Sequence, residues 1–232
     1  RLLDIARRYR LTLIEDATEA LGTRYTAGPL AGRYAGTMGD AGCYSFNGNK
    51  IITTGAGGAV VSNHPHWLEH AKHLSTQAKT DLLQFLHDEV GYNYRMTNVQ
   101  ACLGLAQLER LEGFIEHKKA LYDHYAARLD GVQGLRILPF RTGDARPIRW
   151  SFSPYLKDSG LERDAVIGKL QARGIQTRPV WALIHEQADY PRNEVYCLDK
   201  AEDYRQNIVN LPCSTNLSLE DCERVCQAVL DL

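Results

Sequence analysis

Residues 43–58 read CYSFNGNKIITTGAGG and decide how the surrounding chain folds. The stretch begins in an apolar segment, residues 39–46, which we predict to be a short strand. Lys50 follows this strand and precedes a glycine-rich turn, residues 53–58, after which another short strand is expected over residues 58–62. The turn lacks the Gly-Lys-Ser/Thr ending of a nucleotide-binding loop. We therefore interpret it as a tight turn that lets the backbone pass Lys50.

An acidic pair, Glu15 and Asp16, ends an earlier strand-like run, residues 11–14. Ligands of open parallel sheets bind at the carboxyl ends of the strands, so these acids are well placed for chemistry. Lys50 and Asp16 together suggest a pyridoxal-phosphate site. The lysine amine would form a Schiff base with the cofactor aldehyde, and the aspartate would pair with the pyridinium nitrogen. Each residue alone also has a plainer interpretation, Asp16 as a turn or helix-capping acid and Lys50 as a surface lysine.

The order of the predicted elements indicates an α/β fold whose character changes along the chain. Residues 65–75 and 98–115 show helical periodicity, which is strongest in the second segment. Short strands and helices of an α+β type follow. We therefore expect one domain over residues 1–117 and a smaller one over residues 118–232. A helix over residues 2–9 leads directly into a strand, so we also expect preceding strands in a longer protein.

The composition restricts the classes of function. Of the 232 residues 44% are hydrophobic and 24% are charged, and the formal net charge is −1. No basic block indicates a nucleic-acid partner. The apolar runs are too short to span a bilayer and no signal peptide is visible, so we expect a cytoplasmic protein without membrane contact.

The six cysteines are scattered, and no Cys-x-x-Cys pair occurs. Cys222 and Cys226 are four positions apart in a helical pattern, which suits one helix face. In a chain of this size without a secretion signal, we expect reduced thiols in the core. By the same spacing argument we expect neither a disulfide framework nor a metal site.

Several ordered blocks of sequence resemble the DegT/DnrJ/EryC1/StrS family of sugar aminotransferases. The matching blocks are residues 15–22 (EDATEALG), 39–40 (GD), 44–50 (YSFNGNK), 54–58 (TGAGG), 91–97 (GYNYRMT), 100–101 (QA) and 104–108 (GLAQL). The resemblance covers nearly the whole chain, but the N-terminal part that such proteins carry is absent. It implies the aspartate-aminotransferase fold (fold type I). Residues 1–117 would be the C-terminal part of its cofactor-binding large domain, a mixed and mostly parallel sheet flanked by helices.

The resemblance also assigns roles to residues of a pyridoxal 5'-phosphate site. Lys50 would be the catalytic residue, because it holds the cofactor and then moves a proton between substrate and cofactor carbons. Asp16 would keep the ring nitrogen protonated, and Ser45 would donate its hydroxyl to the phosphate. Asn93 would reach the phosphate in the neighbouring subunit, which implies a homodimer with a shared active site. Ser45 and Asn93 are otherwise an ordinary strand hydroxyl and an ordinary turn residue.

Two positions depart from the common family pattern. Glu19 stands where the family commonly has glutamine near the cofactor ring. The resemblance therefore leaves undecided whether Glu19 contacts a cofactor oxygen. Asn47 replaces a common histidine. The resulting Ser-Phe-Asn-Gly-Asn-Lys variant is similar to that of a subgroup acting on nucleotide-linked acetamido sugars.

Three further residues are candidate substrate contacts by resemblance: Arg95, Arg178 and His185. Arg178 could face a sugar-nucleotide phosphate and His185 the sugar or base, although Arg95 equally suits subunit packing and a lone histidine a structural role. The implied activity moves an amino group from an amino acid, with glutamate as the expected donor, to a nucleotide-linked keto-sugar. The amino sugar would serve surface-glycan biosynthesis.

Two alternatives remain open. The chain could belong to a non-catalytic regulatory or interaction module that keeps the fold. It could also resemble the sugar dehydratases of the same family, which replace the lysine with histidine; Lys50 argues against this.

Overall fold

The computed structural model describes residues 1–81, 83–140, 143–190 and 194–232. The chain divides into two compact units, and its helices and strands form a mixed α/β structure, as the sequence predicted. Unit 1 comprises Arg1–Ile115 and a later segment that ends at Trp150. Unit 2 comprises Glu116–Phe140 and Ser151–Leu232, and the boundary between the units falls within a helix.

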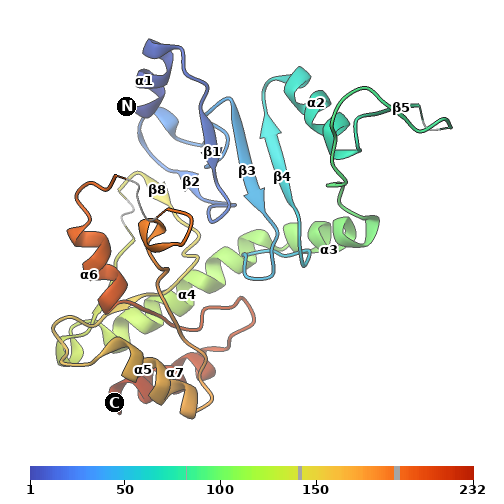
Figure 1. The fold of residues 1–232 in the computed structure, drawn as a ribbon. Coiled ribbons are helices and arrows are strands. Elements are labelled where there is room, and N and C mark those ends of the chain that lie inside the picture. Colours follow the sequence, from blue (N-terminus) through green and yellow to red (C-terminus); the bar gives the residue numbers. More distant parts are fainter. Residues whose placement is uncertain (82, 141–142, 191–193) are drawn as a thin grey trace. The chain divides into compact units, whose positions relative to one another are not determined.

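Unit 1 is built on a three-stranded sheet with the strand order β1-β3-β4 (Figure 1). Its elements are α1 (Leu2–Tyr9), β1 (Ile14–Asp16), β2 (Arg24–Tyr25), the 3-10 helix η1 (Gly28–Leu30), β3 (Ala41–Ser45), β4 (Gly58–Ser62), α2 (Pro65–Ser75), β5 (Lys79–Asp81), β6 (Leu86–His87), α3 (Asn98–Leu108), the start of α4 (Leu111–Leu129) and β8 (Ala145–Arg146). A small apolar cluster lies around Ile51, Ile115 and Ile148.

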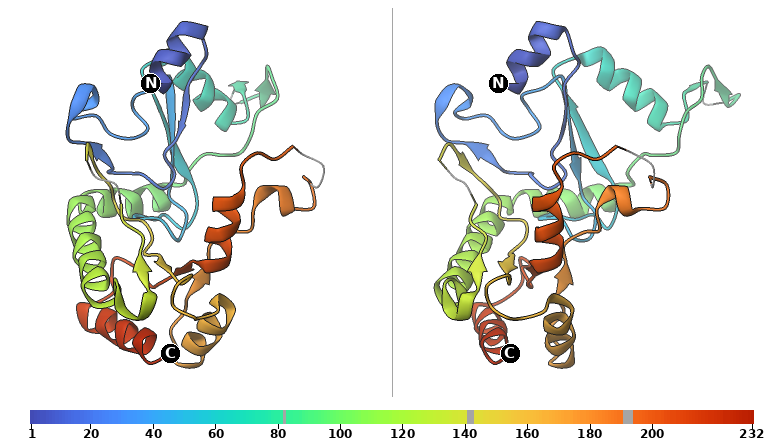
Figure 2. Two further views of the ribbon diagram at one scale, coloured as in Figure 1. Left: turned by 90° about the vertical axis from the view of Figure 1, so that its left-hand side faces the viewer. Right: turned by 60° about the vertical axis from the view of Figure 1, so that its left-hand side comes forward.

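The sheet of unit 1 is mixed. β1 runs parallel to β3, whereas β4 runs antiparallel to β3, and the three strands lie side by side in every view (Figures 1 and 2). The parallel register pairs Ile14 with Ala41 and Asp16 with Cys43. The carboxyl ends of β1 and β3 therefore meet at one edge of the sheet, where ligands of α/β proteins bind.

Most predicted elements of unit 1 are confirmed. Strand β3 is shorter than the strand expected over residues 39–46, and two further predictions were wrong. The expected strand over residues 11–14 is instead β1, which begins at Ile14. Pairing with β3 sets this boundary rather than the apolar run, and the side chain of Ile14 is exposed. The single helix expected over residues 98–115 is two helices, because α3 ends at Leu108 and α4 begins at Leu111.

Unit 2 is an α+β arrangement of short ladders and helices around one apolar core. Its elements are the rest of α4, the 3-10 helix η2 (Val132–Gly134), β7 (Arg136–Ile137), β9 (Pro154–Tyr155), α5 (Arg163–Ala172), β10 (Arg178–Pro179), the 3-10 helix η3 (Ile184–Glu186), α6 (Asp199–Asn207), β11 (Val209–Asn210) and α7 (Leu219–Leu230). The largest fully buried side chains include Tyr125 and Phe152, whose rings pack 5.6 Å apart. Ser218 caps α7 by accepting a hydrogen bond from the Asp221 amide.

Within the described ranges, none of the helices combines the length and the apolar character that crossing a bilayer requires.

Candidate active site

The carboxyl edge of the parallel strand pair carries the first two predicted site residues. Asp16 is the last residue of β1 and pairs with Cys43, and Ser45 is the last residue of β3. The Ser45 hydroxyl accepts a hydrogen bond from the Asn47 amide at 3.3 Å, which starts the turn that leads to Lys50. The Lys50 amide donates to the Asn47 carbonyl at 3.1 Å and closes this turn.

Lys50 lies in a sheltered position, with a side chain only 11% exposed. Its amine forms an ion pair with the carboxylate of Glu19. The same amine lies 5.2 Å from the centre of the Trp150 ring, in the range of a cation–π contact. The Trp150 indole in turn donates to the Asn49 carbonyl at 3.1 Å, next to Lys50 in the chain.

Asp16 is an exposed carboxylate that is held in the ionised form. The hydroxyl and the backbone amide of Thr18 lower the pKa of Asp16, and the positive charge of Lys50 lowers it further. The Thr18 amide donates to Asp16 Oδ1 at 3.1 Å. The field of Lys50 therefore reaches Asp16, which places the predicted amine and acid in one electrostatic environment.

Glu15, next to Asp16, has a structural role. Its carboxylate accepts hydrogen bonds from three backbone amides of residues 36–39: Gly36 at 2.9 Å, Met38 at 2.5 Å and Gly39 at 2.6 Å. Hydrogen bonds to a carboxylate are among the stronger ones in proteins, so this arrangement fixes the end of β1. The position of Asp16 follows from that anchor.

The segment after Lys50 is held from α3. Gln107 makes two hydrogen bonds to one residue, accepting from the Thr53 amide at 3.0 Å and donating to the Thr53 carbonyl at 2.6 Å. Gly55 and Gly57 have φ angles of +80° and +97°, so the predicted tight turn requires glycine at these positions. Lys50 is thus anchored on both sides by neighbouring backbone contacts.

The remaining predicted residues are less closely connected to Lys50. Asn93 and Arg95 belong to unit 1 and are exposed, and Asn93 pairs with Thr76 in an isolated bridge. Arg178 and His185 belong to unit 2, in β10 and η3 respectively. Their roles as substrate contacts stay predictions.

The residues at this edge fit pyridoxal phosphate chemically. A sheltered primary amine suits capture of an aldehyde, and an ionised carboxylate suits a protonated ring nitrogen. A hydroxyl at the neighbouring strand end, Ser45, suits a phosphate oxygen. The single observation that carries this fit is the sheltered Lys50 amine on the turn after β3, the strand whose parallel neighbour β1 ends in Asp16.

Sequence reasoning missed three residues that shape this site. Trp150 lies 101 positions from Asn49, and Gln107 lies 54 positions from Thr53, so no local pattern links them to Lys50. Glu15 was noticed only as half of an acidic pair. Its adjacency to Asp16 could have indicated separate roles, because neighbouring strand residues point to opposite faces.

Comparison with known proteins agrees with the geometry. The DegT/DnrJ/EryC1/StrS aminotransferase family matches the chain over residues 1–230. GDP-perosamine synthase of Escherichia coli O157:H7 is 35% identical over 99% of this chain and 60% of its own length. EpsN of Bacillus subtilis (strain 168), provisionally named a pyridoxal phosphate-dependent aminotransferase, is 34% identical over 100% of this chain and 59% of its own length. The chain thus spans about 60% of the length of these curated relatives.

One solved structure is similar to this chain over nearly its whole length. The crystal structure of the aminotransferase TlmJ from Streptoalloteichus hindustanus matches with a TM-score of 0.87 and 28% identity. The match covers 98% of this chain and 60% of that one.

Proposed function

This chain belongs to the DegT/DnrJ/EryC1/StrS aminotransferase family, and from that premise we propose that its protein is a pyridoxal-phosphate-dependent sugar aminotransferase. Such an enzyme moves an amino group from an amino acid to a nucleotide-linked keto-sugar. The main support from the site is the sheltered amine of Lys50 on the turn after β3, together with the ionised carboxylate of Asp16 at the end of the parallel neighbour β1.

Each proposed role follows from the position of a side chain at the strand edge. When bound, pyridoxal phosphate supplies a ring that accepts electron density from a neighbouring carbanion. Lys50 would hold the cofactor covalently, and its freed amine would move a proton between the substrate carbon and the cofactor carbon. Asp16 would accept a hydrogen bond from the ring nitrogen, and Ser45 would donate one to the phosphate.

Glu19 adds a negative charge beside the Lys50 amine in this proposal, where glutamine would offer only a hydrogen bond. Its carboxylate pairs with the Lys50 amine, so Glu19 orients that amine at the edge of the sheet. Trp150 supports the same amine from its ring face. We propose that Glu19 also lies beside the cofactor ring when the cofactor is bound.

The substrate class is proposed from the relatives. The name of the GDP-perosamine synthase relative supports a nucleotide-linked sugar as the substrate class. A role in surface-glycan biosynthesis is proposed with support from another relative, the lipopolysaccharide biosynthesis protein RfbH of Salmonella typhimurium. Glutamate remains the proposed donor. Arg95, Arg178 and His185 are the proposed substrate contacts, because two guanidinium groups suit phosphate oxygens and an imidazole can hydrogen-bond a sugar.

We further propose a homodimer in the cytoplasm. The side chains of Val99, Leu103 and Leu105 on α3 are more than half exposed, which suits a protein–protein interface. Asn93 is exposed on the same unit and would complete the partner's site. All six cysteines, each within the described part of the chain, lie outside disulfides, which suits a reducing compartment.

The test is to locate the cofactor on the full-length protein. Borohydride reduction of the holoenzyme followed by peptide mass spectrometry should place the adduct on the peptide that contains Lys50. Lys50→Ala should lose both the adduct and the visible absorption of the lysine-bound cofactor. Lys72→Ala, which changes an exposed lysine of α2, should keep both. An adduct on another lysine, or visible absorption that persists in Lys50→Ala, would contradict the proposed function.

A further inference from the structure

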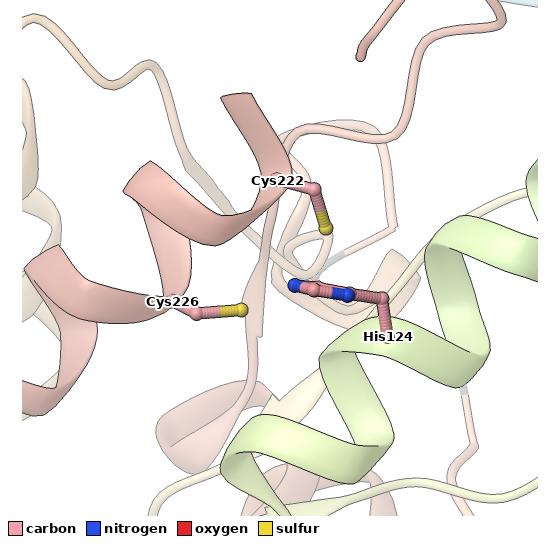
Figure 3. A group of neighbouring side chains, drawn as sticks. All are labelled: His124, Cys222 and Cys226. Carbon is pink, nitrogen blue, oxygen red and sulfur yellow. The ribbon is translucent and has the colours of Figure 1, made fainter. Parts of the chain in front are cut away.

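Two helices of unit 2 bring a histidine and two cysteines together outside the proposed active site. Cys222 and Cys226 lie one turn apart on α7, and His124 lies on α4. Figure 3 shows both sulfur atoms pointing towards the imidazole ring. One potential ligand atom from each of the three residues lies within 4.8 Å of the other two.

The backbone that carries these residues is firmly packed. Leu121 and Tyr125, which flank His124 on α4, are fully buried in the core of unit 2. Val225 is buried beside Cys226, and Cys222 and Cys226 have no exposed surface. Side chains on packed helices have few alternative positions, so the three ligand atoms converge before any ion arrives.

A second layer of contacts orients the imidazole. The Glu223 carboxylate lies 2.8 Å from His124 Nε2, and Arg128 holds the same carboxylate at 2.7 Å. Carboxylates commonly orient histidines that bind metals, or they join the ligands themselves. Glu223 is therefore placed either to direct the ring or to supply a fourth ligand.

We propose that His124, Cys222 and Cys226 form a binding site for a thiophilic metal ion of the Zn²⁺ type. Zinc binds sulfur at about 2.3 Å and nitrogen at about 2.0–2.1 Å, so its ligand atoms lie roughly 3.3–3.8 Å apart. The three ligand atoms now lie within 4.8 Å of one another, so zinc binding would bring each pair closer by about 1.5 Å or less. On binding, both thiols release their protons to solvent as two Zn–S bonds and one Zn–N bond form. Water or Glu223 fills the fourth position.

The competing explanation is a pair of core thiols beside a surface His–Glu pair. In that case the cysteines serve only packing, and the Cys222 thiol donates a weak hydrogen bond to the Leu121 carbonyl at 3.9 Å. The spacing of Cys222 and Cys226 led to the expectation of no metal site. The convergence of His124 from another helix, about a hundred positions away, is what favours the metal.

The direct test uses cobalt(II) as a spectroscopic substitute for zinc in the full-length protein. Titration of metal-depleted protein with Co²⁺ should give thiolate-to-cobalt charge-transfer absorption that saturates at one equivalent per chain, and Zn²⁺ should abolish it. Zn²⁺ alone should raise the unfolding temperature. Absence of the charge-transfer band at stoichiometric cobalt would overturn the proposal.

Variants then assign the ligands. His124→Asn changes a partly exposed side chain, so it should fold, and it should weaken zinc binding by at least about tenfold. Cys226→Ser should remove the charge-transfer band, or reduce it by about half if one thiolate remains bound. The matched control is Cys197→Ser, which changes an exposed cysteine of the same unit and should alter neither the band nor the affinity. Equal zinc affinity in wild type and His124→Asn would also overturn the proposal.

Discussion

Gly42 of β3 lies against Gly36, in the segment (residues 36–39) whose amides bind the Glu15 carboxylate at the end of β1. A Cβ atom at residue 42 would lie 2.0 Å from the carbonyl oxygen of Gly36 and 2.8 Å from its Cα. Real Cβ contacts essentially never fall below 3.0 Å, and backbone atoms cannot rotate away. Gly42→Ala must therefore move Gly36 or β3 by about 1 Å or more.

The cost of that movement can be worked out from the contacts of Gly36. Overpacking of a tight site costs about 1–3 kcal/mol. Moving Gly36 also breaks its 2.9 Å hydrogen bond to the Glu15 carboxylate, and hydrogen bonds to charged groups contribute about 1.5–3 kcal/mol. We expect Gly42→Ala to lower the free energy of unfolding of unit 1 by about 2.5–6 kcal/mol, a large part of the ~5–15 kcal/mol typical of a folded domain.

Urea unfolding of the full-length protein tests this expectation. With a urea dependence of about 1–3 kcal/mol/M, the unfolding midpoint of Gly42→Ala should fall by at least about 1 M. Hydrogen exchange followed by mass spectrometry should show faster exchange in peptides that cover β1 and β3.

The matched control is Gly113→Ala, in α4, where an added Cβ meets nothing within 4 Å. Alanine favours the helix, so this variant should gain about 0.5–1 kcal/mol. A Gly42→Ala protein with the urea midpoint of wild type would refute the reasoning, because the segment at Gly36 could not then lie against β3.

Two further predictions concern other parts of the chain. Asp203 accepts hydrogen bonds from the Tyr155 hydroxyl at 2.7 Å and the Lys157 amine at 3.0 Å, and these contacts hold the pKa of Asp203 below its ordinary value of 3.8. The contribution of Asp203 to stability is present above about pH 4 and is lost as the pH falls through its lowered pKa. Asp203→Asn should therefore lower the unfolding temperature at pH 7 but not near pH 2. An equal difference at both pH values would contradict this expectation. Thr97 caps α3 by a reciprocal pair of hydrogen bonds with Gln100. Thr97→Ala should therefore lower the free energy of unfolding by about 1 kcal/mol and speed hydrogen exchange in α3, whereas Thr97→Ser should behave as wild type. Unchanged exchange in Thr97→Ala would count against the cap.

The neighbouring acids of β1 combine a structural anchor, Glu15, with a proposed cofactor contact, Asp16. Side chains alternate between the faces of a strand, so Glu15 and Asp16 point in opposite directions. The Glu15 carboxylate accepts hydrogen bonds from amides of residues 36–39, whereas the positive charge of Lys50 contributes to lowering the pKa of Asp16. Loss of either acid should damage the site, but only loss of Glu15 should also destabilise unit 1.

Local elements were largely predictable because their signals are local. Helix α2 and strand β4 have the predicted boundaries, since an N-terminal proline and flanking glycines mark them in the sequence. The break between α3 and α4 was not predictable, because residues 109–110 include neither glycine nor proline. Packing of Ile115 against Ile51 and Ile148 helps to place α4, and those partners are distant in the sequence.

The sequence by itself determined the family, and it predicted the cofactor chemistry and the reactive amine, because residues 43–58 and the acidic pair before them carry those signals in short, ordered blocks. Only the tertiary structure decided that Glu19 and Trp150 hold that amine, that Glu15 anchors the neighbouring strand, and that His124 meets Cys222 and Cys226. The physical reason is the range of the interactions. Turn formation and helix periodicity act over a few residues, whereas ion pairs, ring contacts and metal ligands depend on which distant segments the packed core brings together.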